Sequence, residues 1–525
     1  MAEVLVEEVE NTSPSSPSEE PTPSPKANGF KGWLDRYFHI SERGSTITRE
    51  LLGGLVIFLA MFYILPLNAG MLSTSWANVG TVGISAGNMR QVGDVVEILI
   101  YGSGESAVWA SATAVYAAVF AATALSAAVT TIFMGFFGKL PIGLASGLGL
   151  NSLIAYTVML GMGFSFAQSM CIVLVDGILF LIISLTPLRG WIVKYIPKSL
   201  KFAISAGIGF FICFIGFQNV GIIVDGPTLV GLGNLAHLPT TMGLIGIILV
   251  FAISVLPQKN KVMFWVTKFG VIIAIVIMGI ICGSLGSAGV EGFSGFYNDS
   301  YHIKELGNLG LVFGSAFRGF DVFANPMAYA LAFSLLFVDF FDTTGTLVGV
   351  ENGAGMVDAE GRITVDDRPA MIVDAAGTVA GAILGTTTVT SFVESTTGVA
   401  AGARTGLAAV TTGLLFALSL LIYPALSMFS SNAVTGLALV YVGVCMFKSL
   451  ESIEWNDWIA VVSGFLTVIM MCVAYSITDG IAVGFFSYTI LTAVSGRFKK
   501  TDIPVACCTA AFIAIYAVKV ATSLV

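Results

Sequence analysis

Long apolar stretches recur along this 525-residue chain, separated by short polar or glycine-containing segments. A helix needs about 20 mostly apolar residues to cross the hydrocarbon core of a bilayer. The pattern therefore predicts fourteen membrane spans, near residues 51–72, 110–136, 142–160, 166–186, 200–217, 242–257, 263–285, 326–348, 370–384, 385–401, 405–424, 432–447, 457–476 and 480–496. A further apolar stretch, 503–522, is open between a fifteenth span, an interfacial helix and a packed tail. We expect an all-α polytopic membrane protein.

Composition supports this class, because 56% of the residues are hydrophobic and only 11% are charged, whereas soluble domains carry about 25% charged residues. Residues 1–28 are rich in Ser, Pro and acidic side chains, which predicts a disordered tail. They do not show the basic and apolar regions of a cleaved signal peptide. The cysteines lack the spacing of metal ligands or disulfides, and the histidines, His39, His237 and His302, lie outside the predicted spans. We expect no metal and no cofactor.

Basic residues are distributed unevenly between the two sides of the predicted spans. If the N-terminus is cytoplasmic, the other side receives only Arg90, Lys304 and Arg318, and nearly all the other Lys and Arg residues fall on the cytoplasmic side. This asymmetry follows the positive-inside rule. It predicts a multi-pass protein with a cytoplasmic N-terminus.

The spans divide into two groups of seven with opposite orientation, which predicts an inverted repeat. The third span of each group begins with a small-residue segment. Matching segments of this kind point to a transporter site, although isolated glycines also serve close helix packing. We predict a tail and pre-span segment over 1–40, a first repeat over 41–285 with its small-residue segment at 143–151, a connecting loop over 286–325, a second repeat over 326–500 with its segment at 385–394, and an apolar C-terminal segment over 501–525.

Acidic side chains lie inside several predicted spans, where a charge costs at least ~2.5–3.5 kcal/mol at the bilayer centre. Asp339 and Asp342 are three residues apart and share one helix face. Glu394 is expected in the first turn of a half-helix, where free backbone N–H groups favour polar or anionic partners. The alternative for each is a structural hydrogen bond, which we weigh equally with ligand contact for Asp342 and favour for Asp176. We favour a functional role for Asp339 and Glu394.

Two motifs carry a resemblance to a known family. They read Phe337-Val338-Asp339-Phe340-Phe341-Asp342-Thr343-Thr344-Gly345-Thr346-Leu347 and Ser391-Phe392-Val393-Glu394-Ser395-Thr396-Thr397-Gly398, the second followed by Arg404-Thr405-Gly406-Leu407. Over about residues 40–500 the chain resembles the AzgA-like hypoxanthine/adenine/guanine permeases of the nucleobase/ascorbate transporter superfamily. It departs from the usual pattern at Ser146, where the family has proline, and at Ala403, where it has glycine. The first departure bears on substrate preference.

The resemblance implies a seven-plus-seven inverted repeat in which spans 1–4 and 8–11 form a core domain and spans 5–7 and 12–14 form a gate. It implies short strands at the start of spans 3 and 10. It places substrate-binding positions at Asn151, Asp339, Asp342 and Glu394. Family members move purine bases together with protons, often as homodimers. Glu394, Asp339 and Asp176 are the candidate proton-coupling residues.

The chain contains no P-loop, dinucleotide fingerprint or HExxH motif, so neither ATP-driven pumping nor an enzyme is expected. We predict a proton-coupled symporter that imports adenine, guanine or hypoxanthine across the plasma membrane and binds no nucleic acid. A neutral purine suits the predicted site, because its N–H groups donate to carboxylates while Asn151 or backbone N–H groups serve its ring nitrogens. The alternatives are a transporter of xanthine, uracil or a small anion on the same fold, and a channel without coupling.

Overall fold

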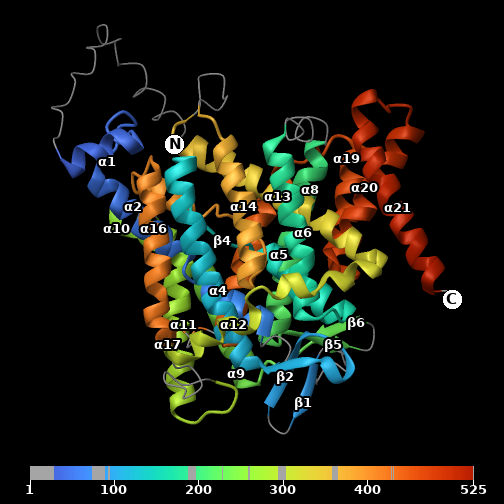
Figure 1. Ribbon diagram of the computed structural model, residues 1–525, viewed down its shortest axis with the longest axis horizontal. Helices are drawn as coiled ribbons and strands as arrows, with labels where there is room; N and C mark the ends of the chain where they lie inside the picture. The colour runs from blue at the N-terminus through green and yellow to red at the C-terminus, as the bar shows by residue number, and fades with distance from the viewer. Residues whose placement is uncertain are drawn as a thin grey trace.

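The computed structural model describes residues 29–523 except for 74–88, 93–94, 187–196, 227–228, 258–259, 294–302, 357–364, 427–428 and 430. This part of the chain is mostly helical (Figure 1). Eight helices among the described residues are long and apolar enough to cross a membrane: Ile47–Ser73, Ala112–Gly138, Phe166–Leu185, Ser199–Val220, Gly270–Ser287, Pro326–Glu351, Asn432–Glu451 and Ile477–Val494. Four shorter apolar helices accompany them: Leu148–Gly161, Leu238–Ser254, Gly406–Ile422 and Trp458–Val473. The prediction of a helical membrane protein is confirmed, and the predicted disordered tail over 1–28 lies outside the described residues.

The N-terminal part supplies a first group of elements. In order they are α1 (Phe30–Phe38), α2 (Ile47–Met61), α3 (Ile64–Ser73), α4 (Ala112–Phe133), the π-helical turn η3 (Met134–Gly138), β4 (Leu144–Ser146), α5 (Leu148–Ser152), the π-helical η4 (Leu153–Gly161) and α6 (Phe166–Leu185). α2 and α3 are one span that breaks at Phe62 and Tyr63. Pro66 explains the break, because proline has no N–H to donate to the carbonyl of Phe62 and its ring crowds that carbonyl.

The C-terminal part supplies a second group. Its elements are α13 (Pro326–Gly353), α14 (Arg368–Leu384), β7 (Val389–Ser391), α15 (Ser395–Ala400), α16 (Gly406–Ser419), η8 (Leu420–Ile422) and α17 (Tyr423–Leu426). The two groups interleave, since α14 packs on α6 and α16 packs on both α2 and α4. A Cβ added to Gly177 of α6 would lie 2.8 Å from the backbone nitrogen of Val379 in α14. Small residues at such contacts let membrane helices approach closely.

The strands β4 and β7 cross in the middle of these helices as an antiparallel pair. Their register places Leu144 opposite Ser391 and Ser146 opposite Val389. The pairing extends beyond both strands, because the N–H of Gly147 donates to the carbonyl of Thr388 and that of Phe392 to Gly143, both at 3.0 Å. Every residue of both strands is buried. The two strands therefore provide hydrogen-bond partners for each other's backbone N–H and C=O groups in the buried interior.

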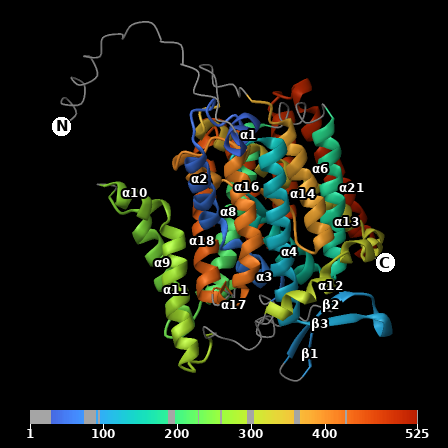
Figure 2. The ribbon, with the colours of Figure 1, turned by 60° about the vertical axis from the view of Figure 1, so that its left-hand side comes forward.

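The remaining helices lie outside the pair of strands. They are α8 (Lys198–Val220), α9 (Leu238–Ser254), α10 (Lys261–Lys268), α11 (Gly270–Ser287), α18 (Asn432–Phe447), α19 (Trp458–Val473), α20 (Ile477–Val494) and α21 (Ile503–Ser523). α18 packs against α8 and α9, and α19 packs against α8 and α20. α9 and α11 lie side by side at one edge of the molecule, and α21 lies at the other (Figures 1 and 2). The stretch 503–522, left open by the sequence, thus forms a helix that packs on α20.

Two further predicted spans, besides the broken first span and the third span with its strand, differ from the observed elements. The segment 385–401 is helical only over α15, because its first part, rich in β-branched Thr and Val, is taken up by the strand crossing. The segment 263–285 is divided at Phe269, which has φ −93° and ψ 14° and ends α10 before α11 begins. The length of the apolar runs identified both segments. It did not show that one contains a paired strand and that the other is divided into two helices.

The polar connections contain structure that the apolar pattern did not predict. β1 (Met89–Val92), β2 (Val95–Tyr101) and β3 (Val108–Ser111) form an antiparallel sheet, with η2 (Gly104–Ser106) between β2 and β3. The sheet lies at the end of the molecule opposite α1 (Figure 2). Other short elements are β5 (Ile223–Gly226), β6 (Leu229–Leu232), η5 (Ile303–Asn308), α12 (Leu309–Val312), η6 (Ser315–Arg318), η7 (Phe320–Ala324), η10 (Lys448–Ser452) and η11 (Lys500–Asp502). The predicted connecting loop 286–325 therefore contains several helical turns.

Candidate functional site

Glu394 lies where β7 gives way to α15, and it occupies the position just before the helix. The side chain is half-buried, and its Oε1 accepts a hydrogen bond of 2.9 Å from the hydroxyl of Tyr63. Tyr63 comes from the break between α2 and α3, so the contact joins the two groups of helices. A sequence prediction had no means to find Tyr63, which is 331 residues from Glu394.

Asp339 lies on α13 and is fully buried. Its Oδ2 accepts a hydrogen bond of 3.0 Å from the hydroxyl of Thr378 on α14. The same Thr378 hydroxyl also lies 3.1 Å from the carbonyl oxygen of Val389 on β7. Oδ1 of Asp339 has no hydrogen-bond partner among the described residues. The carboxyl group therefore retains capacity to accept a donor from a ligand or to carry a proton.

Asp176 on α6 is also fully buried, and neither of its carboxyl oxygens has a hydrogen-bond partner among the described residues. It lies close enough to Asp339 for the two carboxyl groups to repel each other when both are charged. A buried charge without a partner is costly in a membrane. The pair is therefore stable only when its charge is partly neutralised.

Asp342 lies one turn beyond Asp339 on α13 and is half-buried. Its Oδ2 accepts a long hydrogen bond of 3.5 Å from the Thr390 hydroxyl on β7. Asp342 also interacts electrostatically with Glu394. The structure thus places Asp342 on the Glu394 side of α13 and Asp339 on the side facing Thr378 of α14.

Asp374 on α14 completes this set and was not singled out from the sequence. Both of its oxygens are occupied: Oδ1 accepts from the Thr343 hydroxyl at 2.8 Å and Oδ2 from the Ser391 hydroxyl at 2.6 Å. The residue ties α13, α14 and β7 together and is fully buried. A carboxylate inside the apolar run 370–384 was the available signal. We call Asp176, Asp339, Asp342, Asp374 and Glu394 the carboxyl cluster.

Asn151 lies on α5, on the other side of the strand crossing, and is fully buried. Its Oδ1 accepts hydrogen bonds from the hydroxyls of Ser146, at 2.9 Å, and Thr387. Its amide nitrogen lies 3.4 Å from the carbonyl oxygen of Ser146. The amide group is thus engaged within the protein, and the carboxyl cluster is not among the hydrogen-bond partners found for it in the described residues. Ser146, the departure from the family pattern, is one of the two residues whose hydroxyls bind the Asn151 oxygen.

A further amide continues this second network. Asn68 on α3 donates from Nδ2 to the hydroxyls of Thr123 and Thr386, both at 2.8 Å, and those hydroxyls lie 3.1 Å apart. All three residues are fully buried. We call Asn68, Thr123, Ser146, Asn151, Thr386 and Thr387 the amide cluster. It joins α3, α4, β4 and α5 to the segment that precedes β7.

Glu50 is a buried carboxylate outside the carboxyl cluster, and it binds backbone N–H groups. Its two oxygens accept the backbone N–H groups of Arg404, at 2.8 Å, and Thr405, at 3.1 Å. It therefore fixes the start of α16 to the first turn of α2. The Arg404 side chain donates to the carbonyls of Val399 and Ala403, each at 2.7 Å, so its hydrogen bonds hold the backbone between α15 and α16.

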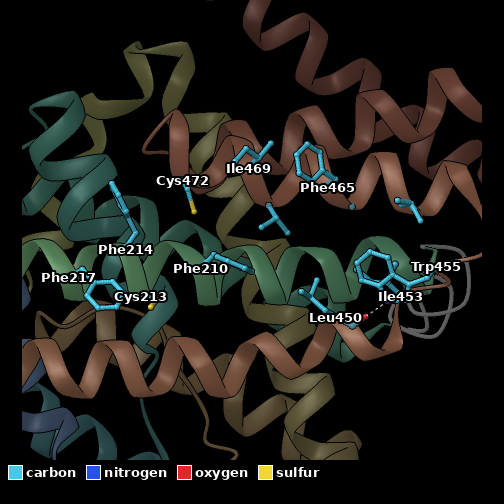
Figure 3. Close-up of a pocket in the computed structure, with 13 residues that line it drawn as sticks. Phe210, Cys213, Phe214, Phe217, Leu450, Ile453, Trp455, Phe465, Ile469 and Cys472 are labelled. Carbon is cyan, nitrogen blue, oxygen red and sulfur yellow. Dashed lines mark hydrogen bonds between the residues drawn. The ribbon is translucent and has the colours of Figure 1, made fainter. Parts of the chain in front are cut away.

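An apolar groove of about 610 Å³ lies between α8 and α19 (Figure 3), and no member of either cluster is among its lining residues. Phe210 and Phe217 of α8 line one wall, and Phe465 and Ile469 of α19 line the other. No carboxyl group lines it, so it does not offer the polar partners that orient a small polar ligand. A much smaller cavity, about 10 Å³, is lined by residues of α3, α11 and α18 together with Tyr63. The carboxyl cluster is the better candidate for a site.

Comparison with known proteins gives a family and several relatives. Residues 105–483 match the model described as the Permease family. The guanine/hypoxanthine permease PbuG of Bacillus subtilis (strain 168) is 37% identical over 469 residues, which cover 89% of this chain and 96% of that protein. The adenine permease AdeP of Escherichia coli (strain K12) is 33% identical over 476 residues, which cover 89% of this chain and 92% of that protein.

Solved structures with the same fold are more distant in sequence. The transmembrane domain of the cyanobacterial bicarbonate transporter BicA aligns with a TM-score of 0.53 at 15% identity and covers 83% of this chain and 96% of that chain. SLC26A9 aligns with a TM-score of 0.55 at 13% identity and covers 88% of this chain and 67% of that chain. At these identities the likeness concerns the fold alone.

Proposed function

Because this chain belongs to the Permease family, we propose that it is a secondary transporter that carries a purine nucleobase across the membrane together with protons. The family membership agrees with the resemblance found in the two sequence motifs. It also makes the protein a transporter and not an enzyme. The names of the relatives, which are adenine and guanine/hypoxanthine permeases, support a purine as the substrate.

The observation that carries the proposal is the position of Glu394. It stands at the junction of a buried strand and a half-helix, with Asp342 nearby and one carboxyl oxygen on Tyr63. A neutral purine carries N–H donors that suit the carboxyl groups of Glu394, Asp339 and Asp342, and ring nitrogens that suit backbone N–H groups or the Asn151 amide. Asn151 would need to exchange one of its present partners to contribute directly.

Proton coupling is supported by the lack of ion pairs to three carboxyl groups of the cluster among the described residues. None of the ion pairs found among the described residues involves Asp176, Asp339 or Glu394. Buried carboxyl groups without a cationic partner are stabilised by taking up a proton. Glu394, Asp339 and Asp176 are the proposed carriers, and movement of the carboxyl cluster between two accessible sides would then move protons with the base.

The proposed architecture is a seven-plus-seven inverted repeat of fourteen spans over 41–285 and 326–500. α2 to α6 and α13 to α16 would form the core domain, which contains both strand–helix junctions. α8 to α11 and α18 to α20 would form the gate that rocks against it. The protein would work in the plasma membrane as a homodimer with its N-terminus in the cytoplasm.

Reconstitution into liposomes tests the function directly. We expect uptake of radiolabelled hypoxanthine, guanine or adenine that is accompanied by proton flux. A protonophore should abolish uphill uptake, and a sodium gradient alone should not support it. Accumulation that depends on sodium and resists the protonophore would contradict the coupling. Uracil that competes as well as the purines would contradict the substrate class.

A further inference from the structure

We propose that Tyr63 is a positioning residue of the substrate site, which holds the Glu394 carboxyl group for the substrate and links it to the helices α11 and α18. This inference rests on the proposed function and adds to it a residue outside the candidate site positions. Tyr63 lies in neither sequence motif. Its contribution follows from where the break of the first span places it.

The break between α2 and α3 points Tyr63 at Glu394. Pro66 removes the N–H that would bond to the carbonyl of Phe62, so the chain leaves the α-helical path at Phe62 and Tyr63 and resumes it at α3. The N–H of Leu65 bonds to the Phe62 carbonyl instead, at 3.2 Å. A kink of this kind is a fixed feature of the backbone, because proline imposes it.

The contact with Glu394 is a hydrogen bond to a group that carries charge in one of its states. The Tyr63 hydroxyl donates at 2.9 Å to Oε1, and the Tyr63 side chain is only 3% exposed. Hydrogen bonds to ionised groups are stronger than neutral ones, particularly where water is excluded. The bond fixes the orientation of the carboxyl group that accepts purine N–H groups in the proposed site.

The other side of Tyr63 faces helices outside the core group. It lines the small cavity together with Ile275 of α11 and with Val434, Thr435 and Ala438 of α18. The adjacent Phe62 ring packs edge-on against Phe429, with ring centroids 6.0 Å apart. Tyr63 therefore lies between the Glu394 carboxyl group and the surface along which α11 and α18 would move. A movement of the Glu394 side chain would therefore be transmitted through Tyr63 to the residues of α11 and α18 that line the cavity.

We expect the fold to survive the loss of the Tyr63 hydroxyl. α3 has a second polar connection to the same segment, since Asn68 donates to Thr386 at 2.8 Å. The Tyr63 ring keeps its packing when the hydroxyl is removed. Tyr63→Phe should therefore fold and insert normally, which makes it a clean test of the hydrogen bond.

The experiment compares Tyr63→Phe with wild type in proteoliposomes and in detergent. Because a net hydrogen bond to a charged group corresponds to roughly a 10-fold or greater change in affinity, we expect the KM of purine uptake to rise about 10-fold. The maximal rate per folded molecule should fall much less. Tyr37→Phe is the matched control, because it also loses one hydroxyl hydrogen bond, 3.2 Å from the carbonyl of Phe136, at a distant place. It should leave the KM unchanged.

A double variant shows whether Tyr63 acts through Glu394. Glu394→Ala is used in place of Glu394→Gln, because a glutamine oxygen would still accept the Tyr63 hydroxyl. Purine binding to the Tyr63→Phe/Glu394→Ala protein, measured by calorimetry, should be no weaker than binding to Glu394→Ala alone. A wild-type KM in Tyr63→Phe, a full additional loss in the double variant, or reduced folded protein with normal affinity would each overturn the assignment. Wild-type protein that takes up no purine would instead remove the proposed function, and this inference with it.

Discussion

At both strand–helix junctions a buried strand is followed by a short helix, but the side-chain chemistry is opposite. After β4, the Asn151 oxygen is bound by Ser146 and Thr387, and its surroundings consist of hydroxyls and amides bonded to one another. After β7, Glu394 has one hydrogen bond to Tyr63 and lies near a second carboxyl group, Asp342. The Asn151 oxygen is therefore occupied by hydrogen bonds within the protein. The carboxyl groups near Glu394 can accept further hydrogen bonds from a ligand.

This difference separates structural from functional polarity in a membrane interior. A neutral cluster of hydroxyls and amides that bond to one another adds rigidity at little electrostatic cost, and in the amide cluster the Oδ1 atom of Asn68 is left without a partner among the described residues. A carboxyl cluster without basic partners is costly unless protons or a ligand compensate it. The same contrast recurs inside the carboxyl cluster, where Asp374 has both oxygens bonded and Asp339 has only one. The contrast yields four predictions.

Glu394→Gln should have the largest effect. The amide keeps the shape and loses the charge, so loss of a hydrogen bond to a charged group, worth about 1.5–3 kcal/mol, should lower purine transport by at least 10-fold. Folded protein, measured by size-exclusion chromatography, should stay near wild type. Glu50→Gln is the matched control, because Glu50 accepts two backbone N–H groups, and it should reduce the amount of folded protein. Normal uptake by Glu394→Gln with an unchanged pH profile would refute the role of Glu394.

Asp339→Asn should mainly affect transport, and Asp374→Asn should mainly affect stability. Asp339→Asn should raise the KM about 10-fold with folded protein retained, because Oδ1 of Asp339 has no partner to lose among the described residues. Asp374→Asn should cost about 1–3 kcal/mol of stability, because its new NH2 group would face a hydroxyl that now donates to the carboxylate. Thermal unfolding and uptake measured on both proteins decide the comparison. Equal effects on stability would remove the distinction.

Asn151→Ala tests the amide cluster. Removing the amide leaves the Ser146 and Thr387 hydroxyls without their acceptor, which should cost about 1–3 kcal/mol and lower the unfolding temperature. The KM per folded molecule should change less than in Glu394→Gln. Ser152→Ala is the control, since its hydroxyl bonds only to the Leu148 carbonyl of its own helix among the described contacts. A large KM effect with unchanged stability would instead show that Asn151 binds substrate directly.

Two glycines test the packing around the paired strands β4 and β7, and the substitution of Gly345 should give the smallest effect of all. Gly345 on α13 is exposed, and a methyl group added there would meet open space among the described residues, so Gly345→Ala should change stability by no more than about 0.5–1 kcal/mol, in the stabilising direction. At Gly147, beside β4, the same methyl group would collide with Thr390, so Gly147→Ala should cost about 1–3 kcal/mol. Thermal unfolding curves of both variants provide the measurement. Equal curves would argue against the packing seen at the crossing.

The apolar pattern identified most of the helices because a helix in a bilayer bonds its own backbone, so its length and composition suffice to define it. It failed where bonding is not local. Residues 386–391 carry five hydroxyl side chains and one valine, and the pairing of β7 with β4 makes residues 389–391 a strand and not a helix. The sheet β1–β3 was missed because it lies in a polar connection between spans.

The sequence by itself determined that carboxyl groups stand inside the spans, since Asp339, Asp342 and Glu394 occur within apolar runs whatever the chain's path. Only the tertiary structure decided what each one does with its oxygens. In the structure both oxygens of Asp374 accept hydrogen bonds from hydroxyls, whereas the Asp176 oxygens have no partner among the described residues. Tyr63 donates to Glu394, although the two residues are 331 positions apart in the sequence. A hydrogen bond depends on distance and direction between two atoms, and for groups on different helices these are set by how the helices cross.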